Sequence, residues 1–188
     1  MIPADAAPIV LAAPPESAPT DLACEPLWPA EARLCFTVPA VANGADAGAR
    51  RIAKRADLEG WQVDLPKLHA AMAEAAAPHV AKGVMVPIVG MEPASWLRLT
   101  DPNGWAAAGV LRPDLLAEKL GGVPIRVAVP ASGMLVAWRS ADPNVDRVMA
   151  IGVRELHEQQ GGRVSDHVWS WDGKTWTPFG RAVKTEGP

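Results

Sequence analysis

The longest periodic segment of this chain predicts an amphipathic helix, and that helix is the strongest constraint on the fold. It runs from Asp64 to about Lys82, with Asp64 placed to cap the first turn and Pro66 where a missing amide costs nothing. Apolar residues recur along it at spacings of three and four, which makes one apolar stripe. We expect Pro78 to kink or end the helix and Gly83 to stop it. Such a stripe needs a second layer of structure to cover it.

The rest of the chain alternates between strand-like and helix-like patterns, with turn signals between them. Short apolar runs predict strands, whereas Pro starts and Gly-Gly stops predict helices. The predicted strands are 34–38, 84–89, 95–100, 105–111, 123–129 and 134–138, and the other predicted helices are 49–58, 113–120 and 143–160. Several connections are hairpin-like. We therefore predict an α+β fold, with a mixed, mostly antiparallel sheet packed by two longer helices.

The first 30 residues have a different composition, because they contain seven prolines among many alanines. Proline lacks the amide donor, so this segment cannot propagate a helix or join the interior of a sheet. We predict an extended Pro/Ala-rich arm over residues 1–30, which packs near Leu27 and Trp28, and a single α+β domain over 31–188.

The C-terminus contains the clearest hairpin signal. Asp172 followed by Gly is the favoured central pair of a two-residue type I′ turn. With that register Trp169 lies opposite Trp176, and Trp171 shares their face of the hairpin. This tryptophan face is expected to be either sheet core or a surface that binds a partner or a flat ligand.

Charge and hydropathy exclude some classes of partner. The 188 residues carry a net charge of −3, whereas a nucleic-acid groove needs a concentrated excess of Lys and Arg. No segment approaches the roughly 18 consecutive apolar residues that span a bilayer, and no signal peptide is evident. We expect no nucleic-acid partner, no membrane span and a cytoplasmic location, with an envelope or exported location as the alternative.

Metal and redox chemistry have few candidate residues. Cys24 and Cys35 are the two cysteines, and their spacing matches no zinc pattern. They are either reduced thiols or a disulfide that closes a short loop, and the missing export signal favours thiols. None of the four histidines belongs to a ligand pair, so we expect no metal and no cofactor.

Ser132 is the nucleophile candidate that we considered. Its sequence context, Pro-Ala-Ser-Gly, lacks the glycine that precedes the serine by two residues in a nucleophile elbow. A triad of Ser132 and Asp142 with His157 or His167 is compatible with the composition, but nothing in the spacing selects it. We assign no catalytic residue, and we favour a protein that is not an enzyme.

Three segments between residues 55 and 180 follow one another in an order found in a known family. Residues 57–82 combine Asp-Leu-Glu-Gly-Trp-Gln-Val-Asp-Leu-Pro-Lys-Leu with an Ala-rich helix, similar to a "dl..Wgvs.eeL...A" segment. Residues 127–137 resemble "aVPSRDlLlf", and 167–176 resemble "ly.w..g.W". In these features the chain resembles the YtpQ-like family of uncharacterised bacterial proteins. The family's Ser-Arg-Asp appears here as Ala131, Ser132 and Gly133, so any activity of those polar residues is expected to be lost.

The sequence therefore predicts a non-enzymatic protein-interaction or accessory module, such as an immunity-like protein, with an unidentified protein partner. Two alternatives remain open. One is a small hydrolase with a Ser/His/Asp site, and the other is a small-molecule binding domain with a Trp-lined cleft. The predicted ligand-binding or partner-binding residues are Trp169, Trp171, Trp176 and Ser132.

Overall fold

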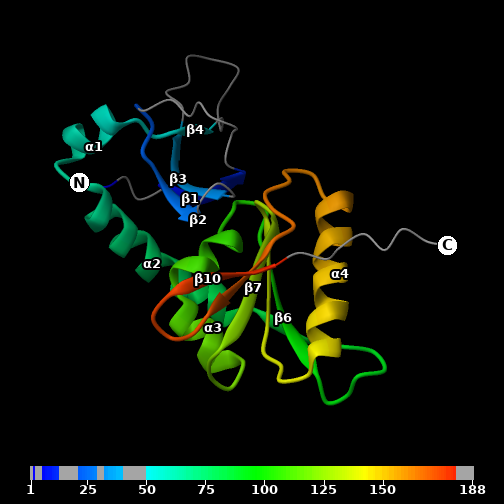
Figure 1. The fold of residues 1–188 in the computed structure, drawn as a ribbon. Helices are drawn as coiled ribbons and strands as arrows, with labels where there is room; N and C mark the ends of the chain where they lie inside the picture. Colours follow the sequence, from blue (N-terminus) through cyan, green and yellow to red (C-terminus); the bar gives the residue numbers. More distant parts are fainter. Residues whose placement is uncertain (1, 3–5, 13–20, 29–31, 40–49, 181–188) are drawn as a thin grey trace.

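The structure, a computed structural model, describes residues 2, 6–12, 21–28, 32–39 and 50–180 (Figure 1). Its strands are β1 (Ala7–Ala12), β2 (Cys24–Trp28), β3 (Ala32–Pro39), β4 (Arg50–Ile52), β5 (Val84–Pro87), β6 (Ser95–Thr100), β7 (Ile125–Ala131), β8 (Met134–Trp138), β9 (Val168–Trp171) and β10 (Trp176–Gly180). Its helices are α1 (Arg55–Trp61), α2 (Leu65–Ala81), the 3-10 helix η1 (Ala107–Leu111), α3 (Pro113–Lys119) and α4 (Pro143–Gln159).

Six strands form the larger sheet, in the order β10-β9-β7-β8-β6-β5. Every neighbouring pair in this sheet is antiparallel. Helix α4 packs on one face of it, and η1 contacts the other face (Figure 1). This arrangement confirms the predicted α+β fold with two longer helices, since α2 and α4 each have 17 residues.

The two long helices begin where the sequence predicts. The Asp64 carboxylate accepts a hydrogen bond from the amide of Lys67, and the Asp142 carboxylate accepts one from the amide of Asn144, both at 2.8 Å. Each bond satisfies an amide that the first turn leaves without a helical partner. Pro78 does not end α2, which continues for three further residues.

The N-terminal strands form a second sheet, in which β3 pairs with β1, β2 and β4. Pro8 lies in β1 and Pro26 in β2, which are edge strands where a missing amide interrupts no interior ladder. Residues 7–12 and 24–28, which we had placed in an extended arm, thus pair with β3. The rest of the predicted arm includes 1, 3–5, 13–20, 29 and 30, which lie outside the described residues.

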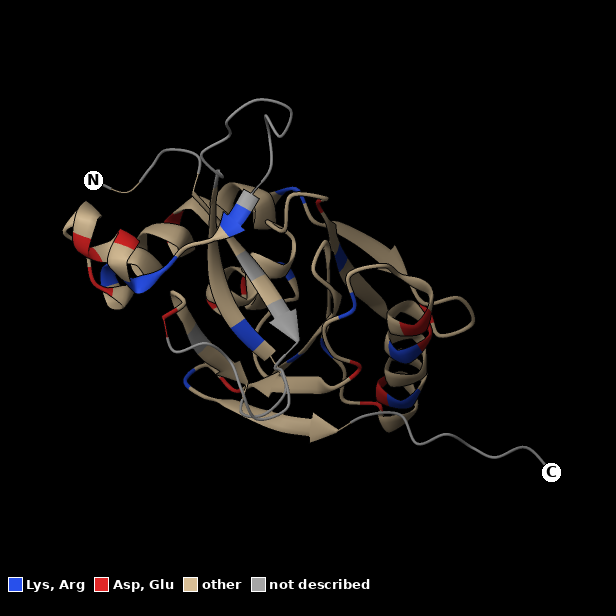
Figure 2. Cartoon of the chain, turned by 90° about the horizontal axis from the view of Figure 1, so that it is seen from above, with Lys and Arg blue, Asp and Glu red and all other residues tan. Residues whose placement is uncertain are grey.

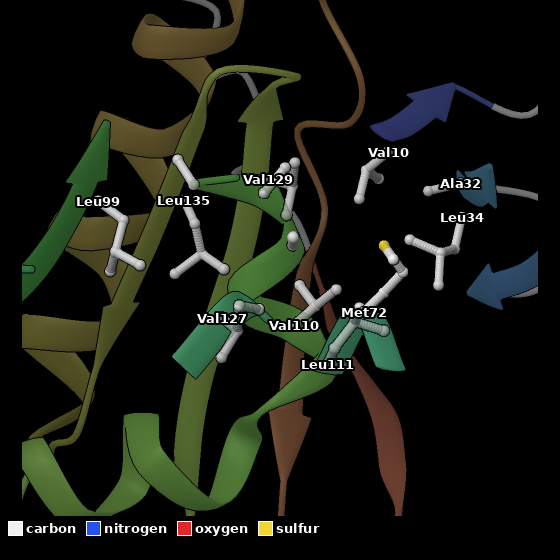
Figure 3. Packing of buried hydrophobic residues seen from close by; sticks show 14 of the residues in the cluster. Val10, Ala32, Leu34, Met72, Leu99, Val110, Leu111, Val127, Val129 and Leu135 are labelled. Atoms are coloured by element: carbon white, nitrogen blue, oxygen red, sulfur yellow. The ribbon is translucent and has the colours of Figure 1, made fainter. Parts of the chain in front are cut away.

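One hydrophobic core joins the two sheets. Figure 3 shows Val10 and Leu34 of the N-terminal sheet on one side and Leu135 of the larger sheet on the other, with Met72 and Val110 between them. All five side chains are buried. A smaller cluster fills the space between α4 and the opposite face of the larger sheet. The shared core makes the described parts of both sheets one folded unit.

Two segments differ from the prediction. Residues 105–111 form a turn and η1 instead of a strand, because a continuous apolar run does not distinguish a buried strand from a buried helical turn. Gly109 permits this close packing, since a Cβ there would lie 3.2 Å from Leu135 and 3.3 Å from Leu99. Residues 49–58 were predicted as a helix, but β4 occupies their first part through its pairing with β3, so α1 starts later.

The C-terminal hairpin has a longer turn than we predicted. Trp171, rather than Trp169, lies opposite Trp176. The Asp172 carboxylate accepts hydrogen bonds from two amides of the turn, both at 2.8 Å, and these bonds organise a four-residue turn. The three tryptophans still share one face, because directly opposite residues and residues two apart point to the same side.

Cys24 and Cys35 form a disulfide. They lie directly opposite one another on β2 and β3, with Cα atoms 4.2 Å apart. Our preference for reduced thiols was therefore wrong, because it did not foresee the pairing of β2 with β3.

Candidate functional site

The hairpin tryptophans singled out from the sequence lie mainly in the core. Trp169 is 4% exposed and stacks on Trp28 of β2, with ring centroids 5.2 Å apart and ring planes 9° apart. Trp176 meets Trp28 edge-on at 6.0 Å and meets Trp171 at 5.3 Å. The tryptophan face thus packs against the N-terminal sheet, and only the half-buried Trp171 and Trp176 reach solvent.

A cleft of about 330 Å³ opens beside Trp176, and we call it the Trp176 cleft. Its lining residues are Pro26, Leu27, His69, Val110, Leu111, Pro113 and Trp176. Trp169 and Trp171 do not line it. The structure therefore brings one of the three predicted tryptophans to a cleft and leaves the other two in aromatic packing.

The triad considered from the sequence is not assembled. Ser132 lies in the turn between β7 and β8, and within the described residues its hydroxyl forms no hydrogen bond to His157, His167 or another histidine. The Nδ1 atom of His157 lies 3.0 Å from the carbonyl oxygen of Pro130. Asp142 caps the N-terminal end of α4, whereas His157 lies near its C-terminal end. At the helical rise of 1.5 Å per residue, these two residues lie roughly 22 Å apart. Ser132, Asp142 and His157 cannot act on one substrate atom.

The larger sheet has two edge strands, and they differ in how they are protected. β10 contains Pro178 and a register shift before Gly180, and both features hinder pairing with a further strand. β5 has the sequence Val-Met-Val-Pro, with no charged residue and with proline only at its last position. No other described strand pairs with its outer edge. Natural sheets protect their edges with charges, prolines or bulges, so β5 is an unprotected edge.

An apolar groove of about 330 Å³ lies next to β5, between α4 and the sheet, and we call it the α4 groove. Its lining comes from α4 (Val148, Met149, Gly152, Val153, Leu156) and from the sheet with the β5–β6 loop (Pro87, Ile88, Val89, Trp96, Val136). A second hollow of about 590 Å³ shares Val148 with the groove and extends to the start of α4. The face of the sheet beside β5 is therefore only partly covered by α4.

Exposed large apolar side chains are concentrated on β5, the β5–β6 loop and α4, and two of them, Val89 and Val148, line the α4 groove. Of the seven among the described residues, five belong to β5, the β5–β6 loop or α4, with exposed fractions from 41% to 91%: Val84, Met85, Val89, Val148 and Ile151. The loop is held by its own backbone, because the amide of Ile88 donates to the carbonyl of Ala94 at 2.9 Å. An exposed apolar patch of this kind is typical of an interaction site.

We did not predict this surface from the sequence. We predicted a helix over residues 143–160 but singled out neither Val148 nor Ile151. The structure buries Val145, Met149 and Val153 but leaves Val148 and Ile151 exposed. An apolar sector wider than one stripe, next to a strand without charged residues, is the signal that could have found it.

The shifted pKa values belong to two ion pairs and to Asp172 of the hairpin turn, and none of these groups lines the hollows described above. Arg51 donates two hydrogen bonds to the Asp57 carboxylate at 2.6 and 2.7 Å, which lowers the pKa of Asp57 to about 2. Arg112 lowers the pKa of Asp114 in the same way. Neither pair lines the Trp176 cleft or the α4 groove. Figure 2 shows both positive and negative residues along α4, so this helix has no stripe of a single sign.

Within the described ranges, no group of three or more His, Cys, Asp and Glu side chains is placed to hold a metal ion. None of the helices in that part of the chain is long and apolar enough to cross a bilayer. No family model matches the chain, and neither a curated protein nor a solved structure matches it. Membership of the YtpQ-like family stays a prediction.

Proposed function

We propose that this protein is a non-enzymatic protein-interaction module that binds an extended segment of a partner protein along β5. The observation that supports this function best is the unprotected β5 edge, with exposed apolar side chains on β5, on the loop that follows it and on α4. In this mode the backbone of the partner segment pairs with β5 as a seventh strand of the sheet. Main-chain hydrogen bonds supply affinity, and side-chain pockets supply specificity.

The α4 groove supplies the side-chain pocket. Alternate side chains of an added strand point to the same face of the sheet, so those on the α4 side are directed toward the groove. Its lining includes Trp96 and Met149, and a methionine adapts its shape to different apolar side chains. We therefore expect the bound segment to carry an apolar residue at a fixed position.

A random peptide library, displayed with constant residues at both ends, tests this function. The library is selected on the wild-type protein, and the selected peptides are measured by fluorescence anisotropy against Gly152→Phe. Gly152 lines the groove, and a Cβ there has no atom within 4 Å, so a larger side chain can start from this position and occupy space in the groove. We expect Gly152→Phe to weaken binding at least about tenfold, because one anchoring side chain of the peptide can then no longer enter the groove.

Gly60→Phe is the matched control, because Gly60 lies in α1 and a Cβ there also has no atom within 4 Å. Binding should be unchanged in this variant. Peptides that bind Gly152→Phe as tightly as wild type would contradict the proposal. A β5-dependent dimer of the chain itself, seen by light scattering, would also contradict it.

Small-molecule binding is a second candidate function, supported by the Trp176 cleft. Its volume of about 330 Å³ is within the usual range for ligand pockets, and its lining is mainly apolar. A metabolite panel measured by tryptophan fluorescence tests it. A signal that survives in Trp176→Phe would place any bound metabolite elsewhere.

A further inference from the structure

A small polar pocket lies at the start of β5, at the opposite end of this strand from the α4 groove. Its volume is about 90 Å³, and its lining includes His79 and Lys82 from the end of α2, Val84 of β5, and Arg98, Thr100 and Asp101 from β6 and the turn after it. At roughly 30 Å³ per water molecule, this volume is sufficient for a carboxylate group.

The pocket carries positive charge without a partner. Within the described part of the chain, the side chains of Lys82 and Arg98 form no hydrogen bond and no ion pair. Asp101 is already engaged, since its Oδ2 lies 3.4 Å from His79 Nδ1 and its Oδ1 accepts a hydrogen bond from the amide of Asn103 at 2.8 Å. Two cations, Lys82 and Arg98, against one anion, Asp101, leave a formal charge of +1 before His79 is counted.

The aromatic packing of His79 keeps that side of the pocket in place. Its ring stacks on Trp105, with centroids 4.8 Å apart and planes 9° apart. The hydroxyl of Thr100 adds an uncharged donor to the lining. A ligand that presents an anion here therefore meets two free cations and a hydroxyl donor, beside an Asp101 carboxylate that His79 and the amide of Asn103 already engage.

The distance between the pocket and the α4 groove fits an extended peptide. Val84 lines the pocket and Pro87 lines the groove, so the two hollows are three strand residues apart, about 10 Å at roughly 3.3 Å per residue. A segment that pairs antiparallel with β5 has its C-terminal end at Val84. Its residues nearer the N-terminus then pass the groove.

We propose that the pocket binds the C-terminal carboxylate of the partner segment. This inference rests on the proposed function, and it makes the partner a protein whose extended C-terminus ends in this pocket. Lys82 and Arg98 contact the carboxylate, since charge-assisted hydrogen bonds are stronger than neutral ones. An apolar side chain about three residues before the C-terminus occupies the α4 groove.

A library of random heptapeptides displayed with free C-termini provides the probes. Each selected peptide is synthesised as the free acid and as the C-terminal amide, and both are measured by fluorescence anisotropy. We expect wild type to bind the acid at least about tenfold more tightly than the amide. In Lys82→Gln/Arg98→Gln this ratio should fall below about twofold.

The matched control is Arg55→Gln/Lys174→Gln, which makes the same change in net charge. Both residues are exposed, and they lie in α1 and in the β9–β10 turn, away from β5. The control should retain the acid-to-amide ratio of wild type.

The outcomes separate this inference from the proposed function. Equal binding of acid and amide to wild type, or an unchanged ratio in Lys82→Gln/Arg98→Gln, would overturn carboxylate capture. If those same peptides still lose affinity for Gly152→Phe, the proposed function stands alone. If no peptide binds, or none depends on the groove, both the function and the inference are overturned.

Discussion

Trp28 provides a direct test of the core that joins the two sheets. It belongs to β2, is 1% exposed, and contacts Trp169 and Trp176 of the larger sheet. Truncation of a buried tryptophan to alanine usually lowers the free energy of unfolding by about 3–5 kcal/mol. Each aromatic pair contributes about 0.5–1.5 kcal/mol beyond its burial. We therefore expect Trp28→Ala to reduce stability by about 4 kcal/mol.

Trp28→Phe is the informative companion variant. The indole Nε1 of Trp28 is buried and has no hydrogen-bond partner among the residues that the structure describes. Phenylalanine keeps an aromatic ring and removes this unsatisfied donor, whose burial costs about 1–3 kcal/mol. The loss in Trp28→Phe should therefore be about half of that in Trp28→Ala, or less.

Urea unfolding of the oxidised protein, followed by circular dichroism and by tryptophan fluorescence, measures both variants. Wild type should unfold in one transition that is the same for both probes, since one core joins the sheets. A loss below about 1 kcal/mol in Trp28→Ala would refute the reasoning. Two separate transitions in the wild-type protein would refute it as well.

Three further predictions concern local features. The native protein should resist a thiol reagent until reductant is added, and labelling without reductant would contradict the disulfide. Reduction of Cys24–Cys35 should lower the free energy of unfolding by about 3 kcal/mol, which is the loop-closure entropy expected for a separation of 11 residues. The pKa of Asp57 is lowered to about 2, so its ion pair stabilises the fold above about pH 4 and loses this effect as the pH falls through 2. Because the pair is partly exposed, Asp57→Asn should cost about 1 kcal/mol at pH 7 in urea unfolding and nothing below pH 2. Thermal melts should show that Gly152→Ala stabilises the protein by about 0.5–1 kcal/mol, because alanine favours the helix and its Cβ meets no atom within 4 Å. Gly83→Ala should destabilise the protein, since its Cβ would lie 2.8 Å from a leucine methyl. Equal effects of the two substitutions would be inconsistent with this packing.

Features set by neighbouring residues could be predicted from the sequence. Asp64 and Asp142 cap helices that begin close to the expected positions, because the cap and the first-turn proline are local signals. The strands β5, β6, β7 and β8 lie close to predicted runs, because short apolar runs bounded by turn residues are also local signals. Pro78 was expected to kink or end α2, but the helix continues past it, which shows that packing can outweigh one lost hydrogen bond.

Features set by distant contacts could not be predicted. The Cys24–Cys35 disulfide depends on pairing between β2 and β3, and proline content concealed β2. The segment 105–111 becomes helical only because it packs between two sheets. The α4 groove is equally non-local, since it needs α4, β5 and β6 in their final arrangement. The tryptophan face was visible in the sequence, but its covering partner, Trp28, was not.

Hydrogen exchange of the β5 amides tests the central claim most directly. The measurement compares the free protein with the protein saturated by a peptide selected from the library with free C-termini. If the peptide pairs with β5, exchange within residues 84–86 should slow markedly, while exchange at the opposite edge strand, β10, should not change. Unchanged exchange in β5 at saturating peptide would contradict strand addition and, with it, the proposed function.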